Sequence, residues 1–101
     1  MAQFDVYRNP NSQSVESFPY LLDTQHDTLS SLNTRVVVPL AIVSKPIRHL
    51  NPVFEIEGQS VVMSTAQIAG VERTHCTQLV INLREHRNEI IDALDFLVNG
   101  F

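Results

Sequence analysis

The spacing of apolar residues changes once along the chain, near residue 83, and this change limits the possible folds more than any other feature. Before it, apolar residues form short runs separated by polar or proline-containing segments, as in strands and turns. After it, apolar residues recur at helical spacing to the end of the chain: Leu83, Ile90, Ile91, Leu94, Leu97, Val98 and Phe101. The pattern predicts a mainly β fold that ends in one amphipathic helix.

Short strands are predicted over residues 4–7, 18–22, 35–43, 53–57, 60–63 and 79–81. Residues 4–7 alternate apolar and polar side chains, which is typical of a half-buried strand. Pro39 has no N–H to donate to a ladder, so we expect a bulge or break there. Gly58-Gln59 is expected to form a tight hairpin turn. Residues 65–69 are expected to form either one turn of helix or an edge strand, which Gly70 ends.

The predicted helix has an N-cap candidate in Asn82 and a left-handed C-terminal cap in Gly100. Its polar side is acidic and carries Glu85, Glu89, Asp92 and Asp95. This face is either a solvated surface or a docking face for a basic partner segment. Phe101 either folds back onto the core or anchors in a partner.

Size and charge narrow the class of protein. The 101 residues suit one domain, residues 1–101, with a modest core that dimerisation would extend. Seven Lys and Arg against eleven Asp and Glu argue against nucleic acid as a direct partner. The single cysteine excludes an internal disulfide, and no apolar run suits a leader or a membrane span. We therefore expect a cytoplasmic protein that does not contact membranes.

No residue pattern predicts chemistry. The four histidines (His26, His49, His75 and His86) lack zinc-ligand spacing, and the three glycines are too far apart for a phosphate loop. Cys76, close to Arg73 and His75, is a weak candidate for a reactive thiolate. The residues alone predict a small acidic binding module with no metal, cofactor or catalytic set.

Residues scattered along the chain match a known family in order and spacing: Gln3-Phe4, Val6-Tyr7, Asp23, Gln25, Asp27, Val37, Pro39-Leu40, Leu50, Pro52-Val53, Ile56, Met63, Thr65, Leu83, Asn88, Ile90, Ala93 and Gly100. With this order and its length, the chain resembles the CcdB toxins of toxin–antitoxin modules. The resemblance implies an SH3-like barrel, α+β but mainly β, with an antiparallel sheet, a small second sheet and a C-terminal helix.

The resemblance also implies what the protein does. A CcdB toxin is a homodimer without enzymatic activity that binds the A subunit of DNA gyrase and traps gyrase on cleaved DNA. The antitoxin CcdA neutralises it through a disordered C-terminal segment. Together they repress their operon, and the toxin meets DNA only indirectly through the antitoxin.

Matched by position, the residues implied to contact gyrase are Thr28, Leu29, Asp95, Val98, Asn99, Gly100 and Phe101. The best-known member of the family ends in Trp-Gly-Ile, and its Trp stacks on an arginine of gyrase, whereas this chain has Asn99 at that position. Two other hypotheses stay open: a MazF-like mRNA endonuclease on the same fold, and a diverged toxin that binds its antitoxin but no longer binds gyrase.

Overall fold

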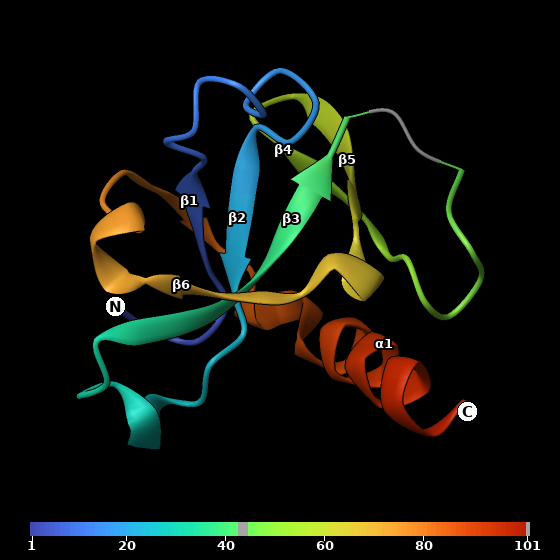
Figure 1. The fold of residues 1–101 in the computed structure, drawn as a ribbon. Coiled ribbons are helices and arrows are strands. Elements are labelled where there is room, and N and C mark those ends of the chain that lie inside the picture. Colours follow the sequence, from blue (N-terminus) through green and yellow to red (C-terminus); the bar gives the residue numbers. More distant parts are fainter. Residues whose placement is uncertain (43–44, 101) are drawn as a thin grey trace.

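A computed structural model describes residues 1–42 and 45–100. Within that part of the chain, seven strands form one curled antiparallel sheet, and one α-helix follows them (Figure 1). The strands are β1 (Asp5–Arg8), β2 (Tyr20–Asp23), β3 (Thr34–Ala41), β4 (Val53–Ile56), β5 (Gln59–Met63), β6 (Ala69–Glu72) and β7 (Leu79–Asn82). The helix is α1 (Arg87–Asn99), and the single 3-10 turns are η1 (Asp27–Leu29), η2 (Thr65–Gln67), η3 (Arg73–His75) and η4 (Arg84–His86). The predicted fold class, a mainly β antiparallel barrel with a C-terminal helix, is confirmed. The small second sheet that was expected is not separate, because all seven strands of the described residues join one curled sheet.

Strand β3 organises the sheet because it changes its partner along its length. The strand order is β4-β5-β3-β2-β1-β7, and β6 also pairs with β3. One edge of β3 pairs with β6 as far as Val37 and with β5 from Leu40 onwards. Pro39 lies at the change, where its carbonyl oxygen accepts the Ser64 N–H at 2.9 Å. The predicted break at Pro39 is therefore wrong: the strand continues, and the proline falls where the neighbouring strand is exchanged.

Two glycine-based expectations need correction. The β4–β5 hairpin exists as predicted, but its turn is Glu57-Gly58, one residue earlier, and both residues have positive φ, 53° and 76°. Paired positive φ angles are typical of the type I′ turn, whose twist matches that of the strands. Gly70 does not end a segment; it lies inside β6, opposite Val36 of β3.

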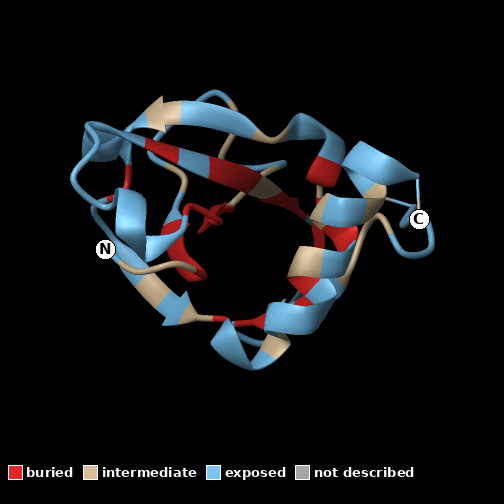
Figure 2. Cartoon of the chain, turned by 90° about the horizontal axis from the view of Figure 1, so that it is seen from below, coloured by how far each residue is buried: buried red, intermediate tan, exposed pale blue. Residues whose placement is uncertain are grey.

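The sheet is buried on both faces. The larger cluster lies between the sheet and α1: Phe4, Val6, Tyr20, Leu22, Val38, Leu40, Phe54, Ile56, Val61, Met63, Leu83, Ile90 and Ala93. A smaller cluster, made of Tyr7, Leu21, Val37 and Cys76 with Val71 packed against it, lies on the opposite face. Figure 2 shows the buried segments around the centre of the molecule.

Burial on both faces explains why residues 4–7 do not form the half-buried strand that their alternation predicted. Asp5 is buried together with Val6 and Tyr7. Its carboxylate accepts hydrogen bonds from the Ala2 N–H, the Tyr7 hydroxyl and the Asn82 amide, at 2.8 to 3.0 Å. A buried carboxylate is tolerated when its oxygens are satisfied in this way.

Replacing Ile90 by alanine tests the contact between α1 and the sheet. Ile90 is fully buried, so Ile90→Ala should lower the free energy of unfolding by about 2–5 kcal/mol. Leu79→Ala is the control: Leu79 is 61% exposed, and its truncation should change stability by less than about 0.5 kcal/mol. Urea unfolding at one protein concentration measures both, and equal losses would contradict the packing described here.

Candidate functional site at the helix end and the β2–β3 loop

The α-helix begins later than the sequence predicted. Asn82 Oδ1 accepts the backbone N–H of Arg84, the first residue of the 3-10 turn η4, at 2.9 Å, while the N-cap position of that turn is Leu83. The helix α1 starts only at Arg87, directly after that turn. Asn82 is therefore not the N-cap of the α-helix. Its side-chain amide also donates to Asp5 and to the Gln3 carbonyl oxygen, so it ties the start of the helical segment to β1.

The apolar stripe of α1 continues beyond the core that it packs on. Ile90 and Ala93 are buried, and Ile91 and Leu94 are partly buried against the larger cluster. One turn later, Leu97 is 37% exposed and Val98 is 80% exposed. In Figure 1 the C-terminal end of α1 lies at the periphery of the molecule. The last turn therefore presents apolar surface that residues 1–42 and 45–100 leave exposed.

The helix end has a defined shape. Gly100 takes φ 77° and ψ 11°, and its N–H donates to the Phe96 carbonyl oxygen at 2.9 Å. This confirms the predicted left-handed C-terminal cap, a conformation that suits glycine because it has no Cβ. Asn99 and Gly100 are exposed. Phe101 lies outside the described residues.

An acidic depression lies beside the last two turns of α1. Its volume is about 470 Å³, and it is lined by His49, Asp92, Asp95, Phe96 and Gly100. The rings of His49 and Phe96 are 6.2 Å apart between centroids, which brings the 45–52 segment close to the helix. Asp95, one of the sequence-predicted contact residues, therefore faces a concave surface with an aromatic wall.

The other predicted contact residues lie in the loop between β2 and β3, residues 24–33. Thr28 and Leu29 belong to η1, where the His26 imidazole nitrogen Nδ1 accepts the Thr28 N–H at 3.1 Å. Leu29 is 49% exposed. Figure 1 shows this loop and the C-terminal end of α1 at separate places on the molecule. The chain therefore carries the predicted contact residues at two separate places on its surface.

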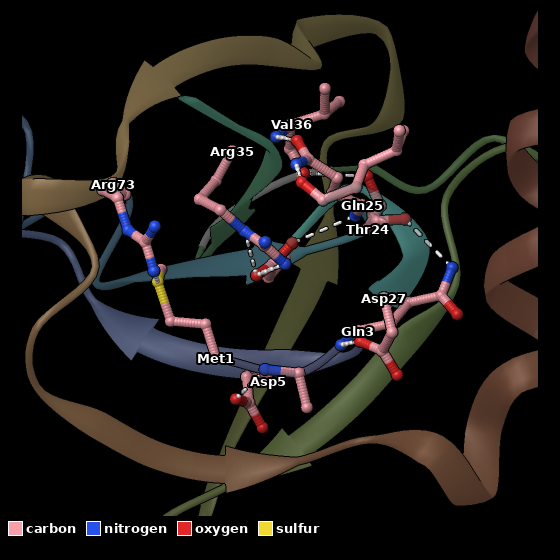
Figure 3. A network of polar contacts seen from close by, with 12 residues as sticks. Met1, Gln3, Asp5, Thr24, Gln25, Asp27, Arg35, Val36 and Arg73 are labelled. Carbon is pink, nitrogen blue, oxygen red and sulfur yellow. Dashed lines mark hydrogen bonds and ion pairs between the residues drawn. The ribbon is translucent and has the colours of Figure 1, made fainter. Parts of the chain in front are cut away.

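Sequence reasoning missed a buried polar network at the base of this loop (Figure 3). Arg35 and Asp23 are fully buried, and Arg35 Nε and Nη2 lie 2.8 Å and 2.6 Å from Asp23 Oδ2. The other carboxylate oxygen of Asp23 accepts the Gln25 N–H at 3.0 Å. Burial raises the pKa of Asp23, while the hydrogen bonds from Arg35 and Gln25 oppose the rise. The sequence did contain a signal for this pair. In a strand, Arg35 lies on the same face as the apolar Val37, so burial of that face also buries a charge that needs a partner.

The structure contradicts a reactive thiolate at Cys76. The thiol is buried, and burial raises its pKa to about 11, with the Asp23 carboxylate adding to the rise. A thiol is a nucleophile only when deprotonated, and a raised pKa prevents this near neutral pH. Within residues 1–42 and 45–100, no group of three or more His, Cys, Asp or Glu side chains is arranged to hold a metal. Among the same residues no helix has the length and apolar character needed to cross a membrane.

The state of Cys76 gives a prediction with a defined pH dependence. At pH 8 the thiol should react with a disulfide reagent only slowly in the folded protein and rapidly in urea. Its pKa is raised from 9.0 to about 11, so its contribution to stability is complete below pH 9 and is lost as the pH rises towards 11. Cys76→Ala should therefore flatten the fall of the unfolding free energy between pH 9 and 11. Rapid modification of the folded protein would show that the thiol is accessible.

Comparison with known protein families agrees with this geometry. The family model described as "CcdB protein" matches residues 3–100 of the 101 residues. The match includes every strand, the helix α1 and the loop of residues 24–33. A match of this extent identifies the family, and with it a partner of antitoxin type. The chain belongs to the CcdB family, the toxins of toxin–antitoxin modules.

Proposed function

We propose that this toxin is a homodimer that binds the A subunit of DNA gyrase and traps the complex of gyrase with cleaved DNA, which stops replication. One observation carries the proposal: the last turn of α1, with Val98 80% exposed, extends past the core of its own chain. In a member of the CcdB family, this exposed helix end matches the position of the gyrase contact. The whole chain, residues 1–101, would act as one unit in the cytoplasm, where gyrase works.

The helix end suits binding because it is ordered before it meets a partner. The Gly100 N–H caps α1, and Ile90 and Ala93 anchor the preceding turns in the core. A preformed surface loses little conformational entropy when it binds, so more of the contact energy remains as affinity. Burying an exposed valine side chain contributes about 1.5–3 kcal/mol at most. Val98 is therefore the apolar anchor that we assign to the gyrase contact, together with Asp95, Asn99, Gly100 and Phe101.

A homodimer would place two copies of each contact surface on one particle. Exposed apolar side chains also lie outside the proposed gyrase contact: Leu32 and Val36 near the start of β3, and Leu97 on α1. Their exposure in a single chain supports an interface between two chains, because a chain of this size has a small core. Two-fold symmetry would then present two helix ends to one gyrase dimer. It would also present two copies of the 24–33 loop, which carries Thr28 and Leu29.

The antitoxin partner follows from the family, and the proposal extends it to CcdA and operon repression. The disordered C-terminal segment of CcdA would wrap the toxin and displace it from gyrase. The toxin has a formal net charge of −4, which opposes direct binding to phosphates. Contact with operator DNA would therefore come from the antitoxin, with the toxin as co-repressor.

Substitutions of Val98 and Leu79 separate gyrase binding from general surface effects. Val98→Asp places a charge on the helix end and should weaken binding to a gyrase A fragment at least tenfold. Leu79→Asp is the matched control, because Leu79 is comparably exposed but lies on β7, away from the proposed contact. Calorimetry with each variant, and growth arrest on expression, measure the effect. If both variants bind like the wild-type chain, the helix end is not the gyrase contact. A separate incubation of the wild-type chain with RNA tests the alternative: specific cleavage would replace the proposal by an endonuclease activity.

Asn99 offers a test in the opposite direction. The best-known member of the family has a tryptophan at this position that stacks on an arginine of gyrase, and losing an aromatic anchor costs about 2 kcal/mol or more. Asn99→Trp should therefore tighten binding to the gyrase A fragment by at least about tenfold. Asn99 is exposed, so the fold should tolerate the change, and circular dichroism checks this. Unchanged or weaker binding would mean that this chain meets gyrase in another orientation.

A further inference from the structure

We propose that Gln25 is the positioning residue for the 24–33 loop: it holds Thr28 and Leu29 in the conformation that meets gyrase. This inference rests on the proposed function, since Thr28 and Leu29 act there as contact residues. Gln25 itself is buried. It would act through the backbone of the loop that it holds.

The loop has no apolar core of its own. Residues 26–34 are all exposed, and its two leucines, Leu29 and Leu32, are about half exposed. Exposed segments with few apolar contacts open at low free-energy cost. Something other than apolar burial must therefore hold the loop if it is to present a fixed surface.

The Gln25 side chain holds the loop through two hydrogen bonds. Its amide Nε2 donates to the Leu29 carbonyl oxygen at 2.9 Å, inside the turn η1. Its amide oxygen Oε1 accepts the Val36 N–H at 3.0 Å, in β3. One buried side chain therefore joins the turn η1 to β3, the strand that follows the loop. Figure 3 shows Gln25 beside Val36.

The amide also extends the sheet beyond the end of β2. The ladder between β2 and β3 ends with Asp23 opposite Val37. Past that point, the Val36 carbonyl oxygen accepts the Thr24 N–H and hydroxyl, both at 2.9 Å, while the Gln25 side chain takes the Val36 N–H. The Gln25 side chain thus takes the place of a backbone carbonyl group as the acceptor of the Val36 N–H, at the point where the loop leaves the sheet.

Gln25 is itself fixed by the buried pair below it. Its N–H donates to Asp23 Oδ1, and the other carboxylate oxygen of Asp23 is held by Arg35. Because the Gln25 backbone N–H is fixed on the Asp23 carboxylate, the Gln25 side chain has little freedom to rotate its amide away from Leu29 and Val36.

The Gln3 side-chain amide donates to the Thr24 carbonyl oxygen and the Arg73 N–H donates to the Asn33 carbonyl oxygen, so these two bonds hold the two ends of the loop. Nearer to η1, the hydrogen bond from the Gln3 N–H to Asp27 Oδ1 at 2.8 Å is exposed to solvent. Exposed hydrogen bonds compete with water, so the buried amide of Gln25 is the stronger hold.

The test uses Gln25→Met, which keeps the length of the side chain and removes both amide hydrogen bonds. Gyrase A binding should weaken about tenfold, and hydrogen exchange of the Leu29, Leu32 and Val36 amides should accelerate at least tenfold. Ile56→Val is the matched control, because it removes one methylene from the buried core in β4, an edge strand that pairs with β5 and is separated from β3 by it. It should lower the urea midpoint while leaving loop exchange and gyrase binding unchanged.

Each outcome decides between the two proposals. Unchanged gyrase affinity or unchanged exchange at Leu29 and Leu32 in Gln25→Met would overturn the positioning role. An equal loss of binding in Ile56→Val would show a general stability effect and overturn it as well. If the wild-type chain does not bind the gyrase fragment, the proposed function fails, while the exchange measurement still shows whether Gln25 holds the loop.

Discussion

The contact of one side of α1 with the curled sheet determines how the rest of this molecule is exposed. Ile90 and Ala93 are fully buried against the inner residues of the strands, and this contact fixes where the helix lies. The helix is longer than the core beneath it, so Leu97 and Val98 extend beyond the region that the sheet covers. The exposed apolar end is therefore a consequence of the same packing that stabilises the fold, and it is the surface that we assign to gyrase.

A second constraint acts at the opposite face of the sheet. There the small apolar cluster adjoins the buried pair of Asp23 and Arg35. Replacing such a buried pair by apolar residues is often neutral for stability, so we look for the role of the pair in the loop that it holds. Here Asp23 also accepts the N–H of Gln25, and Gln25 joins the turn η1 to β3. The buried charges thus give a fixed base to an exposed loop that lacks apolar anchoring.

Periodicity predicted the elements well because most of them follow one local pattern. The β-branched run of β3, the alternating hairpin of β4 and β5, and the helical stripe of α1 are all local features. The errors occur where tertiary contacts decide. Asp5 is buried because Tyr7 and Asn82 satisfy its carboxylate, and Pro39 is accommodated because β3 changes its partner there. The role of Gln25 depends on Leu29 and Val36, which no local pattern relates to it. The contact residues came from family resemblance, since an exposed apolar side chain such as Val98 carries no sequence signal of its partner.

The central claim is that the exposed end of α1 binds the A subunit of gyrase. Titrating the full chain into a gyrase A fragment in a calorimeter tests it most directly, with a chain lacking Gly100 and Phe101 as the comparison. The account predicts binding at micromolar concentration or tighter for the full chain and loss of that binding for the shortened chain. No heat with the full chain, or equal binding by both, would contradict it.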